Sequence, residues 1–195
     1  MSKMTKTIAA LGIVAGLGVA ALPLSSYAVT DTANVTAQAI VGDSISITAD
    51  AADDTVTISD VTANQAVKEG STVLTVTTNN ASGYNVTIKD TDDVTHLTTD
   101  GSDETNGIPA SATLTQNNKG WGFKSSSATT GVTVSTAQQN WRAVTSDTQT
   151  IASRASGASA EGGDKITLTF GVVVDATVPA GTYEDEVVLT ATTKN

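Results

Sequence analysis

Short runs in which apolar and polar side chains alternate recur along this chain of 195 residues. The clearest run covers residues 165–175, where every second side chain is large and apolar: Ile166, Leu168, Phe170, Val172 and Val174. Successive side chains of a β-strand point to opposite faces of its sheet, so such a run buries one face and leaves the other in water. The polar members are often threonine, whose β-branched side chain suits an exposed strand face. The pattern therefore predicts strands and argues against long amphipathic helices.

Weaker runs of the same kind lie nearer the N-terminus. They predict a first strand over 35–41, a pair of short antiparallel strands over 44–48 and 55–59, and two longer strands over 71–78 and 84–89. The linker Asn79-Asn80-Ala81-Ser82-Gly83 consists of residues that tolerate turns, so the last two strands are expected to form a hairpin.

The C-terminal end follows the same scheme. Pro179-Ala180-Gly181 is a turn signal, and it precedes a final strand with Val187, Leu189 and Ala191 on one face. About ten short strands separated by turns predict an all-β protein, an antiparallel β-sandwich of the immunoglobulin-like or pilin-like type.

The first 28 residues have the layout of an export signal. Lys3 and Lys6 precede an uncharged apolar run over 8–21, Pro23 ends that run, and Ser26-Tyr27-Ala28 offers small residues at a cleavage site. The run is too short and too rich in glycine for a spanning helix. We therefore expect residues 1–28 to be removed and residues 29–195 to form a single secreted domain at the cell surface, with no transmembrane segment.

The composition argues against two classes of function, nucleic-acid binding and catalysis. Twenty acidic residues stand against ten basic ones, and an acidic chain repels phosphate backbones, so no nucleic-acid partner is expected. The chain has no cysteine and a single histidine, His96, which lies in a polar segment without a nucleophile motif. We therefore expect a protein that is not an enzyme and that needs no cofactor for catalysis.

Aromatic residues offer two interpretations. Trp121 and Phe123 flank Gly122 at the spacing of a strand, which favours a structural role for both in the core. Trp141 stands among polar residues, and a tryptophan in such a setting is a candidate glycan contact, although core packing remains the simpler interpretation.

One acidic region is a candidate calcium site. Carboxylates gather between residues 90 and 104, and calcium prefers oxygen ligands of this kind: Asp90, Asp92, Asp93, Asp100, Asp103 and Glu104. Their spacing does not match an EF-hand loop, and a solvated acidic loop is the simpler interpretation.

Three stretches carry a resemblance: TTNNASGYNVTI, the Trp-Gly-Phe strand, and VDATVPAGTYEDEVVLTAT. They resemble secreted bacterial surface sandwiches, namely fimbrial and spore-coat-U-like domains and WxL-type wall-associated proteins, most specifically in the closing hairpin over 165–192. The resemblance implies surface structure or attachment. Tyr183 is similar to the corner tyrosine of immunoglobulin-like sandwiches, which implies a structural hydrogen bond to nearby backbone.

These observations lead to two expectations about function. The first is an exported, non-catalytic structural or adhesive surface protein, a candidate subunit of a fibre or layer, with partners among other surface-protein subunits or copies of itself. The alternative is a carbohydrate-binding module for a cell-wall polymer or host glycan. The strand predicted over 35–41 can close its own sheet, or it can cross into a neighbouring copy and complete that copy's sheet.

Overall fold

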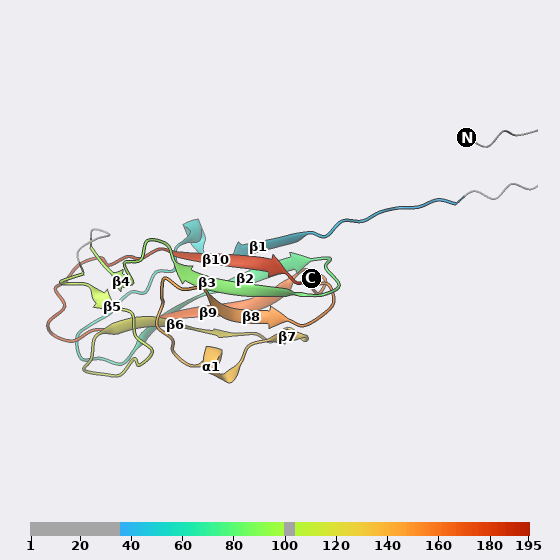
Figure 1. The fold of residues 1–195 in the computed structure, drawn as a ribbon. Coiled ribbons are helices and arrows are strands. Elements are labelled where there is room, and N and C mark those ends of the chain that lie inside the picture. Colours follow the sequence, from blue (N-terminus) through green and yellow to red (C-terminus); the bar gives the residue numbers. More distant parts are fainter. Residues whose placement is uncertain (1–35, 100–103) are drawn as a thin grey trace, which may run out of the picture. The chain divides into compact units, whose positions relative to one another are not determined.

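The computed structural model describes residues 36–99 and 104–195. Val41–Asn195 forms one compact unit, and its architecture is a sandwich of two four-stranded antiparallel sheets (Figure 1). The all-β sandwich predicted from the alternating runs is therefore confirmed. The expected signal peptide, residues 1–28, lies outside the described residues.

The first sheet has the strand order β1-β2-β9-β6, and the second has the order β10-β3-β8-β7. The strands of the first sheet are β1 (Ile45–Ala49), β2 (Lys68–Thr78), β9 (Asp164–Val173) and β6 (Gly120–Ser126). Those of the second are β10 (Val187–Thr193), β3 (Tyr84–Asp90), β8 (Gln149–Arg154) and β7 (Val132–Thr133).

Smaller elements connect these strands. The short strands β4 (His96–Leu97) and β5 (Ile108–Pro109) pair with each other, a 3₁₀ turn covers Ala52–Asp54, and the one α-helix of the described residues, α1, covers Thr136–Gln139. In the part of the chain that the structure describes, no helix is long and apolar enough to cross a membrane.

The core lies between the two sheets and follows the period-two pattern. Leu74 and Val76 of β2 and Ile166 and Leu168 of β9 are fully buried, and they face a layer that β3 and β8 supply from the second sheet. β9 is the central partner of the first sheet, since it pairs with β2 on one side and with β6 on the other. Its burial on the inner face explains why its alternation is the clearest in the sequence.

The prediction of a hairpin over residues 71–90 is wrong. β2 and β3 are both strands, but β2 belongs to the first sheet and β3 to the second, so the linker passes from one sheet to the other instead of joining neighbours in one sheet. The closing hairpin implied by the resemblance is also absent, since β9 and β10 lie in different sheets. Alternation requires each strand to bury one face, and two strands that face each other across a core satisfy that requirement as well as two neighbours do.

Two strands predicted in the N-terminal part are not formed in the single chain. Residues 36–43 form no strand, and Val35 lies outside the described residues. Residues 55–59 form no strand either, and β1 pairs with β2 instead. Val56 and Ile58 are nevertheless half-buried, because they pack over Gly70 of β2. A larger side chain at position 70 would have to displace them.

Candidate functional site

A groove of about 1420 Å³ lies between the two sheets. Its wall on the first sheet comes largely from the central strand β9, through Leu168, Phe170 and Val172. Its wall on the second sheet comes from β10, through Val187 and Leu189. Residues of the 54–63 segment, between β1 and β2, and several polar side chains also line it, so the groove has an apolar floor and a more polar rim.

The two strands that border this opening are edge strands. β1 pairs only with β2, and β10 pairs only with β3, among the strands of the described residues. β1 and β10 come close to each other on one side of the sandwich, and Ala49 of β1 and Leu189 of β10 both line the groove. An unpaired strand edge presents N–H and C=O groups that can accept a further strand.

The segment that precedes β1 has the pattern of a strand without a partner. Residues 36–43 are exposed and hold no strand, with Ile40 90% and Val41 80% exposed. Large apolar side chains that are exposed in an alternating segment favour a contact that removes them from water.

A second feature lies at the acidic rim of the groove. Oxygen atoms of Asp90, Asp92 and Asp185 all lie within 4.8 Å of one another. Asp90 ends β3, and Asp185 lies shortly before β10, which pairs with β3 so that Val187 stands opposite Asp90. A backbone hydrogen bond of 3.1 Å from Thr91 N to Glu186 O holds the two segments together beside the carboxylates.

The charges of this cluster are poorly compensated. Asp90 is 1% exposed, and its Oδ1 accepts a hydrogen bond from Asp92 N while its Oδ2 has no partner. Asp185 Oδ2 is also buried without a partner. Burial, and then the charge of Asp90, raises the pKa of Asp185 to about 7. The fold therefore places three carboxylates together, and no basic side chain offsets the rise in the pKa of Asp185.

Of the four predicted calcium ligands that the structure describes, it brings two together. Asp90 and Asp92 come together with Asp185, which the sequence analysis missed. Asp93 stands outside the cluster in a left-handed conformation (φ 71°), and Glu104 Oε1 lies 3.6 Å from His96 Nδ1. Asp100 and Asp103 lie outside the described residues. The run Glu184-Asp185-Glu186 before the last strand is the sequence signal that could have pointed to Asp185.

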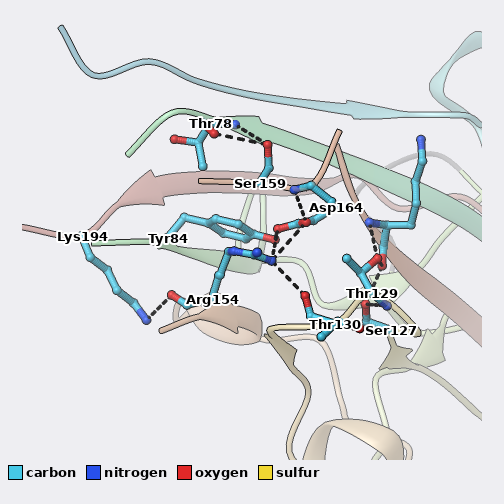
Figure 2. Close-up of polar contacts among 11 residues, drawn as sticks. Thr78, Tyr84, Ser127, Thr129, Thr130, Arg154, Ser159, Asp164 and Lys194 are labelled. Carbon is cyan, nitrogen blue, oxygen red and sulfur yellow. Dashed lines mark hydrogen bonds and ion pairs between the residues drawn. The ribbon is translucent and has the colours of Figure 1, made fainter. Parts of the chain in front are cut away.

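A buried polar network ties the two sheets together elsewhere in the sandwich (Figure 2). Asp164 of β9 is fully buried and accepts hydrogen bonds from the Tyr84 hydroxyl (2.7 Å), Arg154 Nη1 (3.1 Å) and Ala160 N (2.9 Å). Burial and the bond to Asp164 hold the pKa of Tyr84 well above its usual range. Because the carboxylate is satisfied on both oxygens, this network is suited to holding β3, β8 and β9 in place.

Trp141, the candidate glycan contact, packs on the outer side of the first sheet. Its six-membered ring lies against Gly171 of β9, where a Cβ atom would come within 2.4 Å of the ring. Lys124 Nζ lies over the ring at 4.4 Å from its centroid and also pairs with Glu69 at 2.9 Å. A sugar that stacks on this side of the ring would have to displace the ammonium group.

The three residues predicted to be structural all make packing or backbone contacts. Trp121 is 3% exposed and Phe123 is fully buried, both on the inner face of β6. Trp121 Nε1 donates a hydrogen bond to Thr95 O at 3.0 Å, which satisfies its polar atom. The hydroxyl of Tyr183 donates to Pro179 O at 2.8 Å, the kind of backbone contact that the resemblance implies.

Comparison of the chain with protein-family models and with curated proteins finds no significant match. The groove, the carboxylate cluster and the unpaired N-terminal segment are therefore interpreted from their own chemistry.

Proposed function

We propose that the protein is an exported, non-catalytic structural subunit that assembles with copies of itself at the cell surface. In this proposal the N-terminal segment of one copy, residues 29–41, adds as a strand along the groove of the next. The observation that carries it is a groove with an apolar floor beside two strand edges that are unpaired among the described residues. Residues 36–43, which precede β1, are exposed and form no strand.

The chemistry of the segment fits the groove. Its alternating face consists of Val35, Ala37, Ala39 and Val41, and small apolar side chains can pack on a floor of leucine, phenylalanine and valine. Burying these four side chains contributes about 4–6 kcal/mol from apolar area, before the cost of ordering the segment. Backbone hydrogen bonds to an edge strand supply further affinity, as in other cases of strand addition.

The geometry of such an interface favours a fibre. The donated segment and the receiving groove are different surfaces of the same chain, so the contact is head-to-tail. A head-to-tail contact that does not close into a ring extends into a filament. Export by the N-terminal 28 residues would deliver the subunit to the place where it assembles.

Two matched pairs of substitutions test this proposal in the mature protein, residues 29–195. Ala37→Asp with Ala39→Asp places charge on the face expected to enter the groove, whereas Thr36→Asp with Gln38→Asp places the same charge on the other face. Neither pair lies within a strand of the sandwich, so both variants should melt at the wild-type temperature.

Negative-stain microscopy and analytical ultracentrifugation then give the result. We expect filaments from the wild type and from the Thr36/Gln38 variant, and monomers from the Ala37/Ala39 variant and from a chain that lacks residues 29–41. A wild-type protein that stays monomeric at millimolar concentration would overturn the proposal, as would equal assembly of the two charge variants. A peptide pull-down with residues 29–43 against the truncated chain reports groove binding directly.

The glycan-binding alternative has no comparable support, since Lys124 covers the ring of Trp141. It is tested by a pull-down with cell-wall polysaccharide: binding that Trp141→Ala abolishes would establish it.

A further inference from the structure

We propose that Asp90, Asp92 and Asp185 form a calcium site that links the end of β3 to the segment entering β10. This inference goes beyond the proposed assembly and does not depend on it.

The distances between the carboxylates fit a shared ion. Calcium binds oxygen ligands at about 2.3–2.6 Å, so two oxygens on opposite sides of one ion are about 4.8 Å apart. The oxygens of Asp90, Asp92 and Asp185 all lie within 4.8 Å of one another. One ion can therefore contact all three groups without a large change of the backbone.

An independent observation points to a ligand at this place. Asp90 is 1% exposed, and its Oδ2 has no hydrogen-bond partner among the described residues. Asp185 Oδ2 is buried without a partner as well. Burying a carboxylate without a compensating partner is costly, and a bound cation supplies that partner for both atoms at once.

The local backbone already holds the ligands in position. Asp92 N donates to Asp90 Oδ1 at 2.9 Å, and Val94 N donates to Asp92 Oδ1 at 3.0 Å, so the turn after β3 is fixed by its own side chains. The hydrogen bond from Thr91 N to Glu186 O fixes the facing segment. Each carboxylate keeps oxygen lone pairs for a metal, because a carboxylate accepts several bonds.

Calcium fits this site better than magnesium. Asp92 is exposed, so water can complete a coordination shell of six to eight oxygens around a large ion. Magnesium requires a near-ideal octahedron of oxygen ligands at 2.0–2.1 Å, so all three carboxylates would have to move closer to the ion. The ligands come from two segments far apart in sequence, so the ion would stabilise the folded chain and bind the unfolded chain poorly.

The test uses the mature protein and calcium chloride, with sodium chloride added to match ionic strength. Isothermal titration should show one ion per chain, and the melting temperature should rise by about 5–10 °C at a hundredfold excess of calcium over Kd, relative to EDTA. Magnesium should produce a smaller rise at the same concentration.

Three substitutions separate a specific site from general screening of acidic charge. Asp185→Asn and Asp92→Asn should each lose most of the calcium-dependent rise. Asp185→Asn should also melt above the wild type in EDTA, because it removes a negative charge from the cluster. Asp93→Asn is the matched control, because Asp93 is adjacent to Asp92 in sequence and lies outside the cluster. Asparagine also tolerates the positive φ at position 93, so this variant should keep the full calcium-dependent rise.

Absence of binding heat and of any calcium-dependent rise in the wild type would overturn the proposal. So would a rise that Asp185→Asn keeps, or one that magnesium reproduces in full. All these measurements are repeated in the Ala37→Asp/Ala39→Asp background, which is expected to stay monomeric, so that their outcome is distinguished from filament formation.

Discussion

At the scale of single residues, the fold depends on a buried charge with a complete set of partners. Asp164 is fully buried and holds Tyr84 and Arg154 of the opposite sheet. Asp164→Asn keeps the shape and removes the charge, which leaves Arg154 half-compensated, so we expect the free energy of unfolding to fall by about 3–5 kcal/mol. Tyr84→Phe should cost about 1–3 kcal/mol, because it removes one buried hydrogen bond.

Urea denaturation measures both losses. Tyr183→Phe serves as the control, since the hydroxyl of Tyr183 binds the carbonyl of Pro179 in an exposed setting and its loss should cost less than about 1 kcal/mol. If Asp164→Asn cost no more than Tyr183→Phe, the network would not hold the sheets together.

Another carboxylate, Asp50, gives a prediction about pH. Its Oδ1 accepts hydrogen bonds from Val73 N (2.6 Å) and Thr72 Oγ1 (2.9 Å), and these bonds hold the pKa of Asp50 below its usual range. A carboxyl whose pKa is lower in the folded state stabilises the fold above its unfolded pKa, and that contribution is lost as the pH falls through the folded pKa. The wild type should therefore lose stability in acid faster than Asp50→Asn.

Urea denaturation at pH 7 and at pH 3 checks this. The difference in unfolding free energy between the wild type and Asp50→Asn should be largest at pH 7 and should shrink at pH 3. A constant difference would mean that the charge of Asp50 contributes nothing.

At the scale of elements, the sequence predicted the strands better than their partners. The alternation over 165–175 located β9 and its buried face, because a central strand has to match the core on that side. Alternation does not say whether the next strand is a neighbour in the sheet or faces it across the core. The partner that β3 meets at its start is distant in sequence: Tyr84 pairs with Arg154 of β8, and Gly83 (φ 81°) approaches Arg154 O so closely that a Cβ would lie 2.2 Å away.

The outer face of the first sheet gives a prediction for paired elements. The ring of Trp141 lies on Gly171 of β9, so Gly171→Ala pushes a methyl group into the ring. We expect this substitution to cost about 1–3 kcal/mol and to expose Trp141, with a red shift of its fluorescence.

A double-mutant cycle isolates that contact. In a Trp141→Ala background the same Gly171→Ala change should cost little, because the methyl group then meets no ring. Equal losses of unfolding free energy in the two backgrounds would show that the methyl group destabilises the fold through a contact other than the one with Trp141.

At the scale of the whole molecule, the two candidate sites differ in how far the sequence could reveal them. The calcium hypothesis identified Asp90 and Asp92 from local clustering, but Asp185 joins them only through the pairing of β10 with β3. The groove had no signal in the sequence, since it depends on which strands remain at the edges of the two sheets. Local patterns thus predict elements, and sites that combine distant segments require the topology.

The same topology makes a prediction that separates the two routes open to the N-terminal segment. If the segment of one copy adds to the edge of another, amides in residues 29–43 and in β10 (Val187–Thr193) should gain protection from hydrogen exchange together, and only as concentration rises. If the segment closes its own sheet, the protection should be present in the monomer and independent of concentration. Exchange measured by mass spectrometry across the assembly transition, with the Ala37→Asp/Ala39→Asp variant as the unassembled reference, distinguishes them. Protection of the segment without any change in β10 would contradict insertion beside that edge, because a strand that pairs with an edge protects both partners.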